Sequence, residues 1–203
     1  MDKEIIFIGI IEEGFNKYTL NFLDRFLTKY GFDLVYKNSR GIINFYSNKL
    51  SQLVIINMNK KNLESYGIIG LEPDILLIDQ LDEIGYNSSL FSKEFAKCKY
   101  YIINSDDENW TSLGLEDIEG IVVTYGFNLK STITLSSYNI DSTTKANICL
   151  QRDLITIGGK KIEPFEFTLE IDCKMKDNIY PLIGVSALLL ILGYKDENIK
   201  IIN

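Results

Sequence analysis

Short apolar segments recur along the first part of the chain, and polar or amphipathic segments separate them. This alternation is typical of parallel β-α-β units. It predicts strands at residues 4–10, 41–46, 53–57, 74–78, 100–104 and 120–125, and helices at residues 61–66 and 89–97. Between the first two strands, a helix is predicted over residues 18–30. It places Leu20, Leu23, Phe26 and Leu27 on one face and ends before Gly31.

The pattern changes near Thr132, where apolar and polar residues begin to alternate and Gly158-Gly159 indicates a hairpin turn. We therefore expect a small, mainly antiparallel sheet in the C-terminal third. A last apolar stretch predicts a buried helix that begins near Pro181 and ends at Gly193. No repeat or Pro/Ser-rich linker interrupts the chain, so residues 1–203 are expected to form a single α/β domain with two sheets.

Composition narrows the possible functions. A net charge of -7 with no Lys/Arg-rich block argues against binding to nucleic acid or to an anionic membrane. The N-terminus does not resemble a signal peptide, no apolar run is long enough to span a bilayer, and no C-x-x-C pair occurs. We therefore expect a cytoplasmic protein with reduced, structural thiols at Cys98, Cys149 and Cys173. The chain has no histidine, which removes the commonest general base and neutral metal ligand.

Four segments, in order, resemble the central ATP-binding domain of the Mur ligases, the amide ligases that build the peptidoglycan stem peptide. "YYIINSDDENW" resembles the strand and N-A-D-D-P motif of that family, and "VVTYGF" resembles its T-Y-G. "DNIYPLIGVSALLLILGY" resembles its H-N-V-x-N-x-x-A-A helix, and "YGIIGLEPDILLID" resembles the segment before its N-x-x-x-D-H motif. The resemblance extends from Ile5 to Tyr194. It implies a P-loop NTPase-like fold, with a mostly parallel sheet wrapped by helices and a smaller antiparallel sheet.

The phosphate-binding loop of the family, G-V-T-G-T-N-G-K-T-T, aligns with "GIIEEGFNKY" from Gly9 onward. Such a loop needs glycines, whose backbone N–H groups converge on the anion, and a lysine that adds positive charge. This chain instead has Glu12, Glu13, Phe15, Asn16 and Lys17 at the positions of a loop glycine, a threonine, the second loop glycine, the lysine and the metal-binding threonine. We therefore expect that this loop does not bind ATP in the manner of the family.

Other functional positions of the family also differ. Its metal-linked glutamate aligns with Asn57, and the segment from Asp79 to Ile84 lacks the histidine of the N-x-x-x-D-H motif. Lys93 corresponds to the carbamylated lysine only with a local deletion, so we interpret it as a solvated helix residue. Asn178 matches one adenine-contacting asparagine, while Asp177 and Pro181 replace the neighbouring histidine and the second asparagine.

Asp106 and Asp107 follow a strand, at the end where α/β proteins form their sites. One interpretation is a metal-binding or acid/base pair. The other, which we favour, is a turn and helix cap, in which aspartate accepts backbone N–H bonds. If a nucleotide binds at all, the residues expected to hold it are Gly14, Lys17, Asp106, Asp107 and Asn178.

The sequence thus favours a catalytically inactive Mur ligase-like domain that binds a protein partner or a small ligand and is linked to peptidoglycan biology. No catalytic residue, metal or cofactor is expected. The alternative is an ATP-dependent amide ligase-like protein whose rebuilt Mg-ATP site is completed by a partner chain. A third hypothesis is an α/β interaction module in which the resemblance has no functional meaning.

Overall fold

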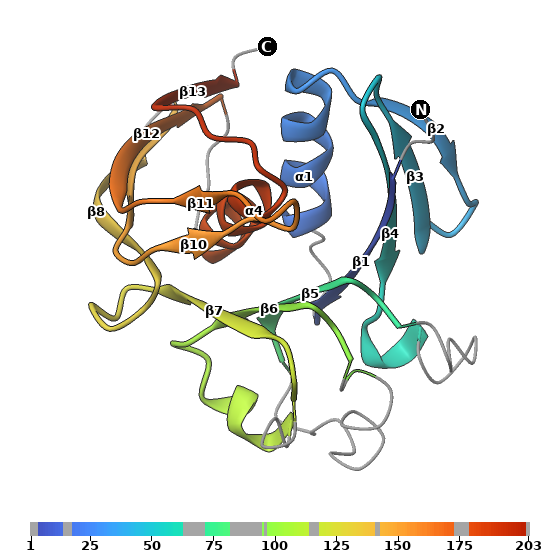
Figure 1. The fold of residues 1–203 in the computed structure, drawn as a ribbon, viewed down its shortest axis with the longest axis horizontal. Coiled ribbons are helices and arrows are strands. Elements are labelled where there is room, and N and C mark those ends of the chain that lie inside the picture. Colours follow the sequence, from blue (N-terminus) through green and yellow to red (C-terminus); the bar gives the residue numbers. More distant parts are fainter. Residues whose placement is uncertain are drawn as a thin grey trace.

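The computed structural model describes residues 4–13, 18–62, 72–81, 95, 97–113, 118–140, 143–172 and 179–201. Within them an 11-stranded mixed sheet, in the order β13-β12-β9-β8-β7-β6-β5-β1-β4-β3-β2, curls around two helices (Figure 1). Its strands are β1 (Glu4–Glu12), β2 (Asp33–Lys37), β3 (Ile43–Ser47), β4 (Ser51–Asn57), β5 (Ile75–Gln80), β6 (Tyr100–Asn104), β7 (Ile121–Gly126), β8 (Ile133–Ile140), β9 (Thr144–Leu150), β12 (Phe165–Ile171) and β13 (Asn198–Ile201). The remaining elements are the hairpin of β10 (Leu154–Ile155) and β11 (Lys161–Ile162), the helices α1 (Tyr18–Lys29) and α4 (Tyr180–Ile191), and the 3-10 helix η1 (Glu108–Leu113).

The middle of the sheet is parallel, from β4 through β1, β5, β6 and β7 to β8. The strands β5 and β6 are almost fully buried, and each reads as a continuous apolar run, as expected for parallel strands covered on both faces. All six strands predicted in this part of the chain are present, with ends shifted by a few residues.

The predicted small antiparallel sheet is present, but most of the alternating segments of the C-terminal third continue the main sheet instead. The strands β8, β9 and β12 are antiparallel to one another but join the main sheet through β7. Only the last residues of β7 pair with the first residues of β8, so a short loop is enough to connect two parallel strands. The separate antiparallel sheet is the β10–β11 hairpin, and it contains the predicted turn at Gly158-Gly159.

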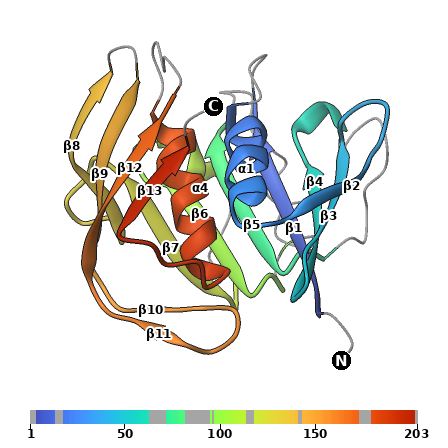
Figure 2. The same cartoon turned by 90° about the horizontal axis from the view of Figure 1, so that it is seen from above.

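Both α1 and α4 lie on the concave face of the sheet, side by side (Figure 2). The helix α1 buries the apolar stripe predicted from its sequence, whereas α4 is apolar on every side and almost entirely buried. Gly31 and Gly193 adopt positive φ just beyond the two helices, as predicted for helix ends. Wrapping of the sheet by further helices stays a prediction, because residues 61–66 and 89–97 lie largely outside the described residues. No helix in the described part of the chain is long and apolar enough to cross a membrane.

The curl of the sheet brings both of its ends against α1. On one side the Tyr30 hydroxyl donates to Asp196, which precedes β13, at 3.2 Å. On the other side the hydroxyl of Tyr46, in β3, donates to Asp24 of α1 at 2.8 Å. The helix α1 therefore has one end of the sheet on each side, and its first turn faces the carboxyl end of β1.

Candidate functional site

The carboxyl ends of β1, β5 and β6 meet at one edge of the sheet, where open α/β sheets place their ligands. Each of these strands carries a polar residue, at its last or second-to-last position, that is buried despite its place at the rim. These residues are Glu12 in β1, Asp79 in β5 and Asn104 in β6, with exposed fractions of 5%, 1% and 7%. Buried polar groups require partners, and the contacts of these three residues define the site.

The Glu12 carboxylate lies at the first turn of α1. Its Oε1 accepts the backbone N–H of Thr19 at 2.9 Å, while its Oε2 is buried and accepts no hydrogen bond. The N-terminus of a helix attracts anions through such N–H groups, so a side chain of the protein itself takes up this donor. Burial raises the pKa of Glu12 to about 7, and the negative charge of Asp79 adds to the effect.

The Asp79 carboxylate is held by two hydroxyl groups. The Tyr125 hydroxyl donates to Oδ1 at 2.5 Å, and the Thr19 hydroxyl donates to Oδ2 at 3.3 Å. Burial raises the pKa of Asp79 to about 6 although both hydrogen bonds favour the ionised form. Because Thr19 donates its N–H to Glu12 and its hydroxyl to Asp79, the two acids form one buried cluster with Tyr125.

Glu13 and Asn57 tie the neighbouring loops together. The Glu13 Oε1 atom accepts the backbone N–H of Lys60 at 2.6 Å, and the Glu13 N–H donates to the Gln80 carbonyl at 3.1 Å. Asn57, which aligns with the metal-linked glutamate of the Mur ligases, accepts the N–H of Asn59 at 3.2 Å. These contacts stabilise the loops. Asn57 carries an amide where the Mur ligases have a carboxylate, so it offers no charged ligand for a metal.

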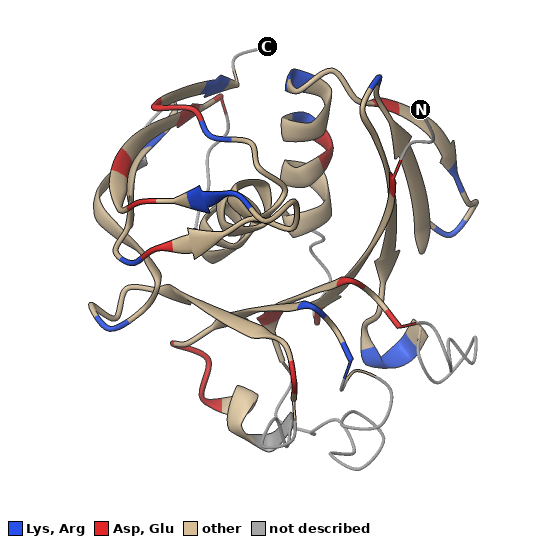
Figure 3. Cartoon of the chain, viewed as in Figure 1, with Lys and Arg blue, Asp and Glu red and all other residues tan. Residues whose placement is uncertain are grey.

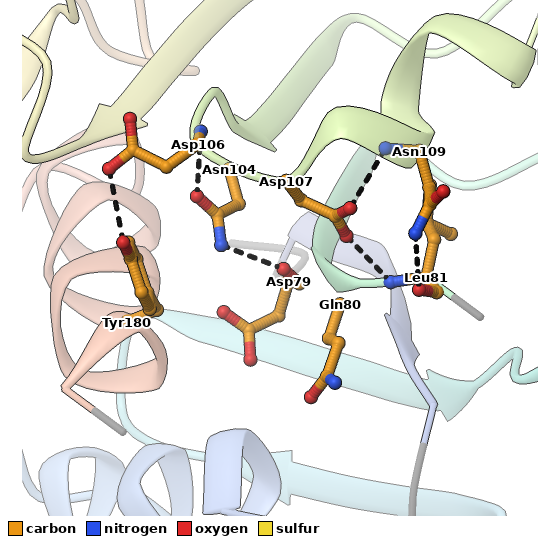
Figure 4. Close-up of a pocket in the computed structure, with 8 residues that line it drawn as sticks. All are labelled: Asp79, Gln80, Leu81, Asn104, Asp106, Asp107, Asn109 and Tyr180. Atoms are coloured by element: carbon orange, nitrogen blue, oxygen red, sulfur yellow. Dashed lines mark hydrogen bonds between the residues drawn. The ribbon is translucent and has the colours of Figure 1, made fainter. Parts of the chain in front are cut away.

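Asp106 and Asp107 accept hydrogen bonds from residues at the ends of neighbouring strands (Figure 4). Asp106 Oδ2 accepts the N–H of Phe127, beyond the end of β7, at 2.6 Å, and the Tyr180 hydroxyl at 3.2 Å. Asp107 Oδ2 accepts the N–H of Leu81 at 2.8 Å, and its Oδ1 accepts the N–H of Asn109 at 2.9 Å, at the start of η1. The bond from Asn109 is that of a helix cap, whereas the bonds from Phe127, Tyr180 and Leu81 join segments that are far apart in the sequence.

A cavity of about 330 Å³ opens beside these residues (Figure 4). It is lined by Asp79, Gln80, Leu81, Asn104, Asp106, Asp107, Asn109 and Tyr180. The lining contains three acids and no Lys or Arg, so its field disfavours an anion. Within the described ranges, no group of three or more acidic or cysteine side chains is close enough to hold a metal ion.

The structure describes only some of the functional residues named from the sequence. Gly14, Lys17 and Asn178 lie outside the described residues, as do Phe15, Asn16, Lys93, Asp177 and Cys173. Asp106 and Asp107 are described and line the cavity together. Of the cysteines, Cys98 is buried and burial raises its pKa to about 12, and Cys149 is half-buried.

Sequence reasoning missed Asp79, Thr19 and Tyr125 as members of the site. Asp79 ends the apolar run "ILLID", the same strand-then-acid pattern that drew attention to Asp106. That pattern was a usable signal for Asp79. Nothing local to Thr19 or Tyr125 indicates their role, because the bonds that join them to Asp79 span 60 and 46 residues.

Comparison with known proteins supports the fold. No family model matches the sequence, and no curated protein matches it. The UDP-N-acetylmuramoylalanyl-D-glutamyl-2,6-diaminopimelate--D-alanyl-D-alanyl ligase of Acinetobacter baumannii superimposes with a TM-score of 0.62 at 10% identity. A murein peptide ligase of Psychrobacter arcticus gives 0.58 at 7% identity. Each match covers 95% of this chain and 44% of the ligase, so the chain spans less than half the length of these structures. The chain has a Mur ligase-like fold.

Proposed function

We propose that the chain is a catalytically inactive Mur ligase-like domain that acts by binding a protein partner or a small ligand in peptidoglycan biology. The link to peptidoglycan rests on the resemblance of the sequence motifs and on the names of the two ligases with the same fold. The proposed loss of activity is inferred from the contacts that the described residues make at the start of α1.

The Glu12 carboxylate carries this proposal. A triphosphate at the start of α1 would need the Thr19 N–H, which Glu12 already accepts. It would also lie beside the Glu12 and Asp79 side chains. Two like charges about 4 Å apart repel by about 1 kcal/mol in water and about 4 kcal/mol near a protein surface. The described residues at the start of α1 therefore do not fit Mg-ATP.

Asp106 and Asp107 add to the same conclusion. Three of their four carboxylate oxygens accept hydrogen bonds from the backbone or from Tyr180. A magnesium ion prefers carboxylate oxygens and water in octahedral geometry. Magnesium binding here would compete with donors that hold the strand ends together.

The test is thermal melting with and without about 1 mM Mg-ATP, which for a ligand at 100-fold excess over Kd would stabilise the fold by about 2.7 kcal/mol. For a chain of this length that corresponds to a shift of several degrees. We expect no shift in the wild type or in Lys17→Ala. The exposed Lys49→Ala variant serves as the matched control for loss of a lysine. A shift in the wild type that Lys17→Ala abolishes and Lys49→Ala retains would overturn the proposal.

The cavity beside Asp106 and Asp107 offers space but no cation for a nucleotide, so the second candidate, an amide ligase-like protein whose rebuilt nucleotide site is completed by a partner chain, needs that chain to supply the positive charge. Its volume of about 330 Å³ is at the low end of the range for small-molecule sites. A Mg-ATP shift that depends on Lys17 and on Asp107 would support this candidate over the inactive one.

A further inference from the structure

A second cavity, of about 310 Å³, lies between α1 and the hairpin of β2 and β3. It shares no lining residue with the cavity of Figure 4. The polar side chains around it are Asn21 and Asp24 from α1, Lys37 from the end of β2, Ser39 and Arg40 from the turn of the hairpin, and Asn44 and Tyr46 from β3. The hairpin is marked by basic residues in Figure 3, on the side of the molecule farthest from β12. The cavity therefore combines cations, a carboxylate and amides.

Asn44 supplies the first sign of a ligand. Its side chain is 4% exposed, and its Oδ1 atom accepts no hydrogen bond. A buried acceptor that lacks a donor costs about 1–3 kcal/mol, and the Asn44 side chain belongs to the lining of the cavity. An N–H group of a bound molecule would satisfy it.

Asp24 supplies an anchored negative charge. The Tyr46 hydroxyl donates to Asp24 Oδ1 at 2.8 Å and fixes the carboxylate between helix and sheet. Burial, followed by the hydrogen bond to Asp24, raises the pKa of Tyr46, so this hydroxyl stays protonated and remains the donor. The Asp24 carboxylate keeps further acceptor capacity for a cationic or N–H group of a ligand.

Lys37 and Arg40 supply the opposite charge. Both are exposed at the rim of the cavity, and the Lys37 ammonium forms no ion pair within the described residues. Together with Asp24 they give this rim a net charge of +1, counted as two cations and one carboxylate. Lysine and arginine both bind carboxylates and phosphates.

We propose that this cavity binds a small anion that carries an amino group. Its acidic group would lie between Lys37 and Arg40, and its ammonium would donate to Asp24 and Asn44. A ligand with a net charge of about -1 would balance the rim, which fits an amino dicarboxylate or a phosphorylated amine. The proposal goes beyond the inactive-ligase proposal and is independent of it, because no residue of the Glu12 cluster takes part.

The test is isothermal titration of the purified chain with two amino compounds and their counterparts without nitrogen. L-Aspartate is compared with succinate, and O-phosphoethanolamine with ethyl phosphate, each up to about 10 mM, which detects binding as weak as a few millimolar. The first pair tests a carboxylate as the anionic group, and the second pair tests a phosphate. We expect saturable binding of at least one amino compound, and at least about tenfold weaker binding of its counterpart, since the hydrogen bonds of the ammonium to Asp24 and Asn44 are lost.

Variants assign the binding to the cavity. Asp24→Asn retains an acceptor for Tyr46 but removes the charge that attracts the ammonium, and Lys37→Gln removes a cation from an exposed side chain. We expect about tenfold weaker binding in each variant and unchanged binding in Lys49→Gln, a matched change at an exposed lysine outside the cavity. Thermal melting checks that each variant is folded. The proposal is overturned if neither amino compound binds, if the counterparts bind equally well, or if binding survives both cavity variants.

Discussion

Replacing Glu12 with glutamine tests the energetic consequence of the buried carboxylate. Glutamine keeps a side-chain oxygen that can accept the Thr19 N–H. It removes the negative charge, which burial and the nearby Asp79 carboxylate disfavour. At pH 7 and above, the wild type must keep the Glu12 carboxylate ionised while it is buried, which lowers the free energy of unfolding. The variant is not subject to that cost, so we expect Glu12→Gln to be more stable than the wild type above pH 7.

The magnitude follows from the pKa of Glu12, which rises from 4.5 in the unfolded chain to about 7 in the fold. The folded state therefore binds this proton more tightly than the unfolded state does, and the free energy of unfolding falls as pH rises from about 4.5 to about 7. A difference of about 2.5 pKa units corresponds to about 3 kcal/mol, which is an upper estimate because a charged carboxylate can draw in water. Asp79 contributes a fall of the same sign, but at lower pH, between about 4 and about 6.

Urea denaturation at a series of pH values measures this effect. Between pH 6 and 8 we expect the stability of the wild type to fall more steeply than that of Glu12→Gln, with the variant ahead by about 2–3 kcal/mol at pH 8. Near pH 4.5 the two should be nearly equal, because Glu12 is then protonated in the fold. Glu163→Gln, at an exposed glutamate, is the control and should follow the wild type. Equal pH slopes for Glu12→Gln and wild type, or a less stable variant at pH 8, would refute the reasoning.

Three further substitutions probe the contacts around this cluster. Tyr125→Phe removes the hydroxyl that favours the ionised form of Asp79, so it should cost about 1–3 kcal/mol, with a larger loss in urea denaturation at pH 8 than at pH 5. Gly184→Ala places a Cβ 2.9 Å from the ring of the fully buried Tyr125 and should cost about 1–3 kcal/mol, which an unchanged melting temperature would contradict. Asp106→Ala leaves the Phe127 N–H without its acceptor and should cost about 1 kcal/mol and speed hydrogen exchange of that amide.

The sequence predicted the middle of the sheet and the helices α1 and α4 well, because these elements follow local rules. The apolar runs that form β1, β5 and β6 are buried on both faces, and the stripe on α1 repeats with helical period. The edge strand β2 was missed because all of its residues are exposed and its apolar run, Leu34 to Tyr36, is only three residues long and does not alternate with polar residues. The attachment of β8 to β7 depends on pairing across a loop, which no periodicity encodes.

In the candidate site, too, local features were predicted from the sequence and long-range contacts were not. That two acids, Glu12 and Glu13, stand where the first strand ends was visible from the sequence, and it led to the prediction that they repel a triphosphate. The bond from the Thr19 N–H to Glu12 was not visible, because it depends on where α1 begins relative to the end of β1. Asp106 and Asp107 were located by their strand, but the donors that bind Asp106 come from residues 21 and 74 positions away.

The most direct test of the central claim is isothermal titration of the chain with Mg-ATP near pH 7.5. The account predicts no saturable heat, that is, a Kd weaker than about 1 mM, because the Thr19 N–H is already bound to Glu12 and the neighbouring acids repel a triphosphate. One-to-one binding tighter than about 1 mM would contradict it.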